Sequence, residues 1–164
     1  MTRIEPHRSP DPAPRLHLTP EGNWCELRRP SPDRRPRPAL FLDRDGVIVE
    51  DVGYISRPGD VALIEGAGQA IAEANRRGWP VVIVSNQSGI GRRYLNWHDF
   101  AAVQARIMAD LAAFGAEIDM VLACGFHPEA ADPAFQHPAH PWRKPQPGMI
   151  LAAAARLAID LGRS

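Results

Sequence analysis

The 164-residue chain is long enough to form one domain with a sizeable hydrophobic core. Its 19 basic and 19 acidic residues give a formal net charge of zero, so no overall field attracts nucleic acid. Two cysteines are too few for a disulfide framework, no apolar run is long enough for a membrane span, and no signal-peptide pattern opens the chain. We therefore expect a cytoplasmic protein without a nucleic-acid or membrane partner. The pattern defines no oligomeric state, and a monomer is our expectation.

Residues 1–38 are rich in proline and arginine and show no hydrophobic period. They hold nine of the 17 prolines and are predicted to form an irregular N-terminal extension. Acidic residues are interspersed with the arginines, which argues against a basic tail for nucleic acid or anionic lipid. Within this extension, Leu18–Leu27 is apolar enough to fold back onto the domain as a short ribbon. The domain itself is predicted to span residues 39–164.

From residue 39 onward, apolar runs alternate with helical periods. Strands are predicted at residues 39–43, 81–84 and 120–123, and helices at 67–77, at 97–114 and from Pro145 to about Leu161. Gly78 and Gly115 mark the ends of the first two helices, and Asn96 is typical of a helix start. A loop rich in proline and histidine is expected at 127–147. This alternation predicts a Rossmann-like α/β fold of three layers around a parallel sheet.

Two carboxylates stand at the end of the first predicted strand. Residues i and i+2 of a strand face the same way, so Asp43 and Asp45 are expected to project together from its carboxyl end. In open α/β sheets this is the edge where ligands bind. Two close carboxylates repel each other, so they require a shared proton or a cation such as Mg²⁺ between them. The alternative is an ordinary turn, because Asp and Gly are common turn residues.

Two further features carry phosphate chemistry. The second strand ends in Ser85-Asn86-Gln87-Ser88-Gly89, whose hydroxyls, amides and backbone N–H groups form a ready cradle for an anion. Such a stretch on its own is equally consistent with a simple loop. Lys144 is the one lysine among the 19 basic residues. A compact ammonium suits contact with a phosphate oxygen, although a single lysine can also stand there by chance.

Phe41–Ile48 resembles the first signature of the haloacid-dehalogenase-like (HAD-like) phosphatases, subfamily IIIA. The Asp-Arg-Asp-Gly form is typical of the branch that contains heptose-bisphosphate and histidinol-phosphate phosphatases. The resemblance implies that Asp43 is the nucleophile, that Asp45 is the general acid and base, and that both bind Mg²⁺. Residues 85–92 are similar to the second signature, in which Ser85 holds a phosphate oxygen.

The remaining roles also follow from the resemblance. Residues 142–149 are similar to the third signature, which makes Lys144 catalytic and directs Arg143 to the rest of the substrate. The substrate-binding residues implied by the family pattern are Asp51, Val52, Gly53, Tyr54, Asn86, Gln87, Ser88 and Arg143. Tyr54 could instead simply pack its loop. Where the family often has Arg-Gly, this chain has Arg92-Arg93, which could change how the substrate is gripped.

The implied activity is Mg²⁺-dependent hydrolysis of a small phosphorylated sugar through an aspartyl-phosphate. The favoured substrate is D-glycero-D-manno-heptose 1,7-bisphosphate, cleaved at the 7-phosphate. Histidinol phosphate is the first alternative, and DNA 3′-phosphate ends are disfavoured because no basic groove is evident. A different class of function is a catalytically impaired fragment that acts as a binding module.

Many members of this branch hold zinc through Cys-x-His and Cys-x-Cys pairs. Here Cys124 is present, but Phe126 stands in place of the histidine, and His140 and Trp142 stand in place of the later cysteines. Cys124, His127, His137 and His140 could still offer ligands, although their spacing matches no standard site. Structural zinc is therefore not expected.

The resemblance covers residues 39–164 and three signatures of four. The fourth, a strand ending in Gly-Asp that completes the Mg²⁺ site, is not found before Ser164. We expect a shortened version of a longer enzyme, with the C-terminal strands of the fold missing. Strand 39–43 would then lie at an edge of the sheet, where its free N–H and C=O groups could pair with another chain.

Overall fold

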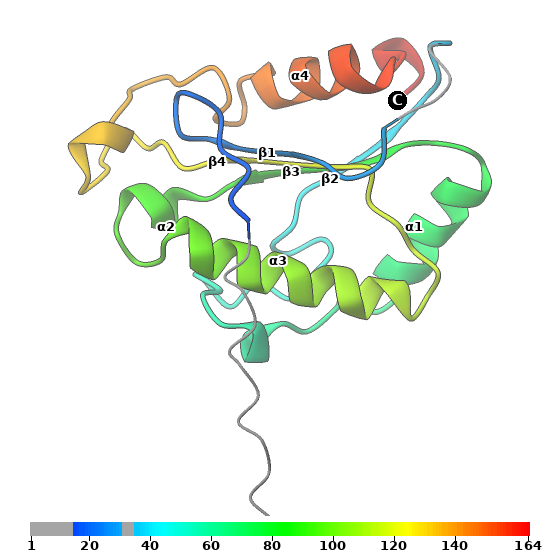
Figure 1. Ribbon diagram of the computed structural model, residues 1–164, viewed down its shortest axis with the longest axis horizontal. Helices are drawn as coiled ribbons and strands as arrows, with labels where there is room; N and C mark the ends of the chain where they lie inside the picture. Colours follow the sequence, from blue (N-terminus) through cyan, green and yellow to red (C-terminus); the bar gives the residue numbers. More distant parts are fainter. Residues whose placement is uncertain (1–14, 31–34) are drawn as a thin grey trace, which may run out of the picture.

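The computed structural model describes residues 15–30 and 35–164. Figure 1 shows one sheet between two layers of helices. The strands are β1 (Trp24–Leu27), β2 (Leu40–Leu42), β3 (Val81–Asn86) and β4 (Met120–Cys124). The helices are α1 (Ala67–Arg76), α2 (Ser88–Gly91), α3 (Trp97–Ala112) and α4 (Gly148–Leu157), with short 3₁₀ turns η1 (Pro58–Asp60), η2 (Pro133–Phe135) and η3 (Leu161–Arg163). Within the described ranges, no helix has the length and apolar character needed to cross a membrane.

The strands form a single sheet in the order β1-β4-β3-β2. β2 and β3 are parallel, as are β3 and β4, whereas β1 pairs antiparallel with β4. The carboxyl ends of the three parallel strands therefore meet at one edge of the sheet. That edge lies on the left in Figure 1, where β3 leads into α2 and β4 leads into the long segment before α4.

Side-chain alternation in the central strands builds a core on each face of the sheet. Val81 and Ile83 of β3 pack in the cluster that includes α1 and α3, whereas Val82 and Val84 pack in the cluster that includes α4. All five residues of β4 are buried, as expected of a strand covered on both sides. Helix α4 covers one face and α1, α2 and α3 cover the other (Figure 1). The predicted three-layer α/β fold is confirmed.

Strand β1 lies inside the range predicted to be an irregular extension. Its residues pair with β4 from Trp24 opposite Ala123 to Leu27 opposite Met120, so this part of residues 1–38 completes the sheet. Trp24 is 2% exposed and packs edge-on against Phe100 of α3, which supplies the apolar reason for the return of the chain. The expected fold-back of Leu18–Leu27 is therefore observed for the strand. Residues 1–14 and 31–34 of the predicted extension lie outside the described residues.

Helix boundaries follow the predictions except at α4. The side chain of Asn96 caps α3 and forms a capping box with Asp99, as the pattern indicated. The last helix was predicted to run from Pro145 to about Leu161, but it begins at Gly148 and ends at Leu157. Ala158 adopts left-handed backbone angles (φ 51°, ψ 56°), which stops the helix and lets Ile159 form a parallel β-bridge with Arg37.

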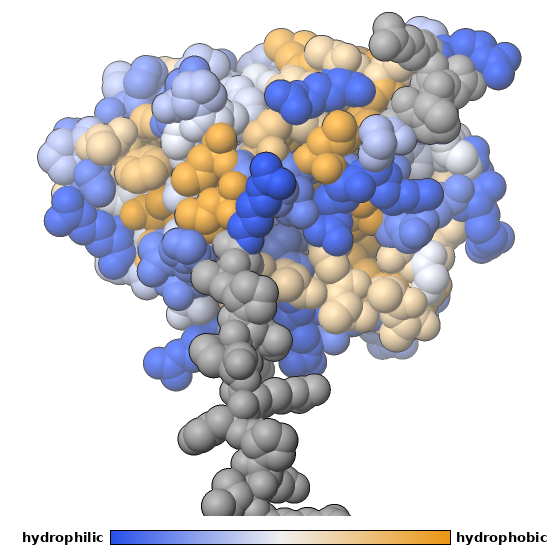
Figure 2. Space-filling view, in the orientation of Figure 1, coloured by the Kyte–Doolittle hydropathy of each residue, from blue (hydrophilic) through white to orange (hydrophobic). Residues whose placement is uncertain are grey.

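Among the described residues, β2 is the outermost strand on its side of the sheet, as predicted for strand 39–43. It is three residues long, and its ladder to β3 runs from Leu40 opposite Val81 to Leu42 opposite Ile83. Beside its amino end, the Ala39 N–H donates to the Ser164 hydroxyl at 3.1 Å. On the face drawn in Figure 2, hydrophobic residues form separate patches between hydrophilic ones.

Candidate active site

Polar side chains from three parts of the chain converge at the carboxyl ends of β2 and β3. They surround a hollow of about 240 Å³ lined by Asp43, Asp45, Asp51, Gly53, Tyr54, Asn86, Gln87, Ser88 and Lys144. The two acids follow β2, the amides are the last residue of β3 and the residue after it, and Lys144 comes from the segment that precedes α4. The parallel sheet therefore brings the first and third signatures together across 101 residues of sequence.

The Lys144 ammonium is in direct contact with the Asp43 carboxylate. Its Nζ donates to Asp43 Oδ2 and also to the backbone oxygen of Val84, at 3.0 Å, in β3. Both side chains are partly open to solvent, with 28% of Lys144 and 40% of Asp43 exposed. The one lysine of the chain thus offsets the charge of the acid predicted to be the nucleophile, and it leaves that acid accessible from the hollow.

Asp45 is held by a second, separate set of donors. Arg44 Nε donates to both carboxylate oxygens, at 3.0 and 3.1 Å, and Arg44 Nη2 lies 2.9 Å from Oδ1. Gln87 Nε2 donates to Asp45 Oδ2 at 2.8 Å and to the Ser85 hydroxyl at 2.9 Å. Each of the paired acids therefore has its own cation, so the two do not depend on each other for neutralisation.

Three of the sequence-predicted residues do not line the hollow, and a fourth, Asn86, lines it but uses its side chain in another contact. Ser85 is 1% exposed, beneath Gln87, whereas Ser88 lines the hollow. Val52 points to solvent with 63% exposed. Arg143 Nη1 donates to the backbone oxygen of Phe126 at 3.2 Å. The side-chain amide of Asn86 is hydrogen-bonded to the backbone of Lys144. The substrate contacts of these four residues stay predictions.

The loop after the acids forms one wall of the hollow. Gly53 has a φ of 92°, and its N–H donates to Asp51 Oδ1 at 2.9 Å, which closes a tight turn. The Tyr54 ring lies over Gly89, where an added Cβ would come within 2.7 Å of it. The same ring meets Tyr94 edge-on, with ring centroids 4.8 Å apart. Tyr54 is therefore both a packing residue and a wall of the site.

The histidine-rich loop packs through rings. His140 stacks on Phe126 with centroids 4.0 Å apart and planes 13° apart, and its Nδ1 lies 3.8 Å from the Cys124 sulfur. Burial raises the pKa of the Cys124 thiol to about 11 and lowers the pKa of His140. His127 lies elsewhere, beside Arg92. Within residues 15–30 and 35–164, no three His, Cys, Asp or Glu side chains gather as a metal site.

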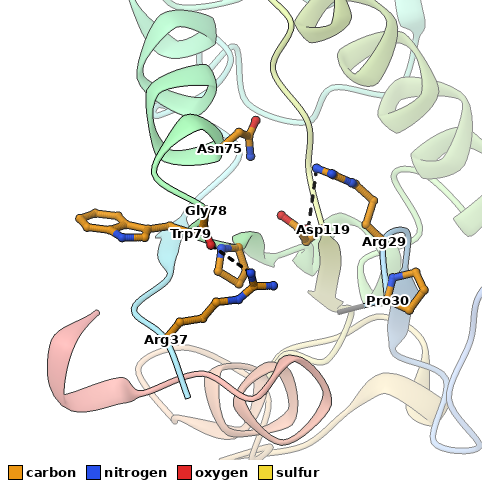
Figure 3. Close-up of a pocket in the computed structure, with 8 residues that line it drawn as sticks. Arg29, Pro30, Arg37, Asn75, Gly78, Trp79 and Asp119 are labelled. Carbon is orange, nitrogen blue, oxygen red and sulfur yellow. Dashed lines mark hydrogen bonds and ion pairs between the residues drawn. The ribbon is translucent and has the colours of Figure 1, made fainter. Parts of the chain in front are cut away.

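A second hollow, of about 250 Å³, lies at the opposite edge of the sheet. Figure 3 shows Arg29 and Arg37 reaching into it from two sides, toward Asp119 and Gly78. Asp119 is 8% exposed, burial raises its pKa, and its Oδ2 accepts the Val81 N–H at 2.8 Å. These contacts tie the starts of β3 and β4 together, so we assign them a structural role.

The donor set of the first hollow suits a hard cation. Mg²⁺ prefers oxygen ligands, keeps several waters and commonly takes one or two carboxylates together with a substrate phosphate. Asp43 and Asp45 supply two carboxylates in the wall of one hollow, so the residues present fit this ion. The same acids, with an ammonium beside one of them, are the groups that phosphoryl transfer to a carboxylate requires.

Comparison with known proteins identifies the family. A family model described as polynucleotide kinase 3 phosphatase matches residues 55–161. A crystal structure of a HAD-like phosphatase from Mesorhizobium loti superposes with a TM-score of 0.83 at 48% sequence identity, covering 90% of this chain and 70% of that one. The chain belongs to the HAD-like phosphatases.

The named relatives with which the chain shares most of its length are heptose-bisphosphate phosphatases. The D-glycero-beta-D-manno-heptose-1,7-bisphosphate 7-phosphatase of Mesorhizobium japonicum is 48% identical over 147 residues, which is 90% of this chain and 67% of that protein. The corresponding Thermosynechococcus vestitus enzyme is 44% identical over 132 residues, 79% of this chain and 67% of that one. The D,D-heptose 1,7-bisphosphate phosphatase of B. bronchiseptica, crystallised with magnesium and phosphate, has a TM-score of 0.66 at 30% identity and covers 76% of this chain and 65% of that one.

Two residues of the HAD-like site were missed by the sequence reasoning. Arg44 lies inside the first signature and pairs with Asp45. Its position between two acids in the sequence could have indicated such an ion pair. Tyr94 lies 40 residues from Tyr54 and reaches it only through the turn after α2, where Tyr94 N–H donates to the Gly89 oxygen. No local pattern could have revealed that contact.

Proposed function

We propose that this chain carries the phosphoryl-transfer site of a Mg²⁺-dependent sugar phosphatase. The proposed substrate is D-glycero-D-manno-heptose 1,7-bisphosphate, hydrolysed at the 7-phosphate. The observation that carries the proposal is the contact between the Lys144 ammonium and the Asp43 carboxylate, inside a hollow that Asp45 also lines. The names of the two relatives that are 44% and 48% identical support the sugar bisphosphate as substrate.

The reaction proceeds in two steps. First, an Asp43 carboxylate oxygen bonds to phosphorus as the bond from phosphorus to the sugar oxygen breaks, and Asp45 gives that oxygen a proton. Second, water attacks the phosphorus of the aspartyl-phosphate, Asp45 takes a proton from the water, and the bond to Asp43 breaks. Sugar hydroxyl and inorganic phosphate leave, and both acids are restored. Lys144 offsets negative charge at Asp43 and at the phosphate throughout.

Asp43 and Asp45 would hold the metal ion. When bound, Mg²⁺ screens the phosphate charge so that a carboxylate can approach phosphorus. Support for this ion comes from the magnesium and phosphate in the B. bronchiseptica structure and from the two carboxylates in the hollow. The cytoplasm is the proposed compartment, because a sugar bisphosphate is too highly charged to cross a membrane unaided.

The substrate is proposed to lie between the Asp51–Tyr54 loop and the start of α2. Asp51 and Ser88 line the hollow and offer hydrogen-bond partners for sugar hydroxyls, while the Tyr54 ring offers an apolar face. Arg143 and Val52 would meet the substrate outside the hollow. Ser85 would contribute to phosphate binding from beneath Gln87.

The test is phosphate release from three compounds with Mg²⁺ in excess and again with EDTA. The compounds are the heptose bisphosphate, histidinol phosphate and an oligonucleotide with a 3′-phosphate, the last because of the family description. We expect turnover of the heptose bisphosphate, its loss with EDTA, and a fall of about a thousandfold or more in Asp43→Asn.

Asp110→Asn is the matched control, because Asp110 also pairs with a cation, Arg106, on the exposed side of α3. That variant should keep wild-type turnover. Preference for another compound of the panel would replace the proposed substrate. Binding of the heptose bisphosphate without turnover, unchanged in Asp43→Asn, would instead make the chain a binding module.

A further inference from the structure

We infer that Arg44 is a positioning residue, whose buried guanidinium holds Asp45 as a proton acceptor for the second step of the reaction. The inference rests on the proposed function, and it concerns a residue to which the family pattern gives no part in the chemistry. Arg44 lies between the two acids in sequence. It is 1% exposed, whereas the Asp45 side chain retains 19%.

Arg44 binds Asp45 through two of its three nitrogens. Nε is shared between Oδ1 and Oδ2, and Nη2 lies close to Oδ1. Such a side-on contact of a planar guanidinium fixes the plane of the carboxylate as well as its position. Nη2 also donates to Gln87 Oε1 at 3.2 Å, while Gln87 Nε2 donates back to Asp45 Oδ2. The three side chains close a ring, so Asp45 cannot rotate without breaking contacts to both partners.

The guanidinium is itself fixed from behind. Its central carbon lies 5.2 Å from the centroid of the Phe100 ring in α3, which is fully buried. A buried cation is retained only where a partner compensates its lost hydration, and here the ion-pair partner is Asp45. Its third nitrogen, Nη1, is buried without a hydrogen-bond acceptor among the described residues. Among the described residues, the guanidinium therefore directs its hydrogen bonds to Asp45 and Gln87 alone.

The contacts match one stage of the reaction. Both oxygens of Asp45 accept hydrogen bonds from N–H groups, and this arrangement suits the carboxylate that remains after Asp45 has given its proton to the departing sugar oxygen. The next event is removal of a proton from the water that attacks the aspartyl-phosphate. Arg44 and Gln87 hold the Asp45 carboxylate in one orientation for this proton transfer, so less conformational entropy is lost when the transition state forms.

The test separates the two steps with 4-nitrophenyl phosphate. Nitrophenolate leaves without a proton, so formation of the aspartyl-phosphate does not need Asp45, whereas its hydrolysis does. In the full chain with Mg²⁺, Arg44→Lys should keep the burst of nitrophenolate in the first turnover and lose about tenfold or more of the steady-state rate. Equal losses in burst and steady state, or no loss in either, would overturn the inference.

Arg77→Lys is the matched control. Arg77 also lies over a ring, that of Trp79 at 5.6 Å, and its Nε also donates to a carboxylate, that of Glu73 at 2.7 Å, but it is exposed and far from the hollow. Arg77→Lys should change neither the burst nor the steady-state rate of nitrophenolate release. If Arg44→Lys loses its cooperative unfolding transition, Phe100→Leu takes its place, because it loosens the guanidinium while keeping its charge. The same selective loss, smaller in size, is then required.

A second readout does not depend on activity. The Arg44 Nε–H should give a proton–nitrogen NMR signal that exchanges slowly with water and moves in Asp45→Asn. A signal that exchanges rapidly with water, or whose chemical shift is unchanged in Asp45→Asn, would refute the contact between Arg44 and Asp45. If the wild-type chain shows neither burst nor turnover, the proposed function fails, and this signal alone decides whether Arg44 holds Asp45.

Discussion

The side-chain amide of Asn86 is paired with the backbone of Lys144 at both of its ends. Asn86 Oδ1 accepts the Lys144 N–H at 2.9 Å, and Asn86 Nδ2 donates to the Lys144 oxygen at 3.1 Å. Strand β3 therefore fixes the position of a residue 58 places farther along the chain. The placement of the ammonium beside Asp43 depends on this pair as well as on the lysine itself.

Asn86→Ala should lower turnover by about ten- to a hundredfold, because a small misplacement of Lys144 weakens its contact with the transferring group. The control is Asn75→Ala. Asn75 pairs in the same way with the backbone of Glu117, at 2.8 and 3.0 Å, at the other edge of the sheet. Both variants should lose stability by roughly 1–3 kcal/mol in urea unfolding. Equal turnover in the two variants would show that Asn86 is merely structural.

Tyr94→Ala should raise the KM of the heptose bisphosphate by roughly two- to tenfold, in line with the energy of an aromatic pair, and change kcat little. The Tyr94 ring packs against Tyr54 and does not line the hollow, so its loss frees the wall proposed to face the sugar. Tyr94→Phe should behave like wild type, because the contact is made by the ring. Leu151→Ala, at an exposed apolar residue of α4, serves as the control. A fall in kcat with constant KM would contradict this role.

Gly148→Ala should lower the Tm by roughly 5 °C. A Cβ at this position would lie 2.4 Å from the Pro141 oxygen and 2.8 Å from its carbonyl carbon, and backbone atoms cannot turn aside as a side chain can. Gly59→Ala is the control, since a Cβ there meets nothing within 4 Å and the φ is ordinary. Thermal unfolding of the two variants decides the matter, and equal Tm values would refute the close approach at Pro141.

Stability should fall as the pH drops from 7.5 to 5.5. Burial, with a smaller contribution from His137, lowers the pKa of His140 below its usual 6.5, so in this window the unfolded chain binds more protons than the folded one. The contribution of neutral His140 is fully present above that usual pKa and is lost toward the lowered one. His140→Phe keeps a ring on Phe126 and should flatten the dependence of Tm on pH. His98→Gln, at an exposed histidine, should leave it unchanged.

The sequence predicted the parts of the fold that local patterns determine. The alternation of apolar and helical periods located β3, β4, α1 and α3. Asp43 and Asp45 line one hollow as expected, although β2 ends at Leu42, so that both acids follow the strand rather than alternate within it. The meeting of Lys144 with Asp43 was also predicted, although only the family pattern suggested it. Fold and family were confirmed, whereas the chemical roles of the site residues stay predictions.

Contacts that depend on tertiary packing escaped the sequence. β1 is a strand because Trp24 reaches Phe100 and the free edge of β4, neither of which is adjacent to it in sequence. The end of α4 at Ala158 could not be predicted from a glycine, because an alanine adopts the left-handed backbone angles there. The next residue, Ile159, forms the β-bridge with Arg37. The burial of Arg44 could not be predicted from the sequence, because it depends on contacts with Phe100 and Gln87, which are distant from it along the chain.

The placement of Asp43 has a consequence for motion. This acid follows directly on β2, three residues joined to the rest of the sheet by one ladder, whereas Ser85 and Asn86 belong to a strand with a neighbour on each side. Amide protons of Phe41 and Leu42 should accordingly exchange with solvent sooner than those of Ile83 and Val84. A bound phosphate that engages Asp43 and Lys144 together would link the end of β2 to β3, because Lys144 is hydrogen-bonded to Val84 and Asn86 of that strand, and it should slow the exchange most at the end of β2.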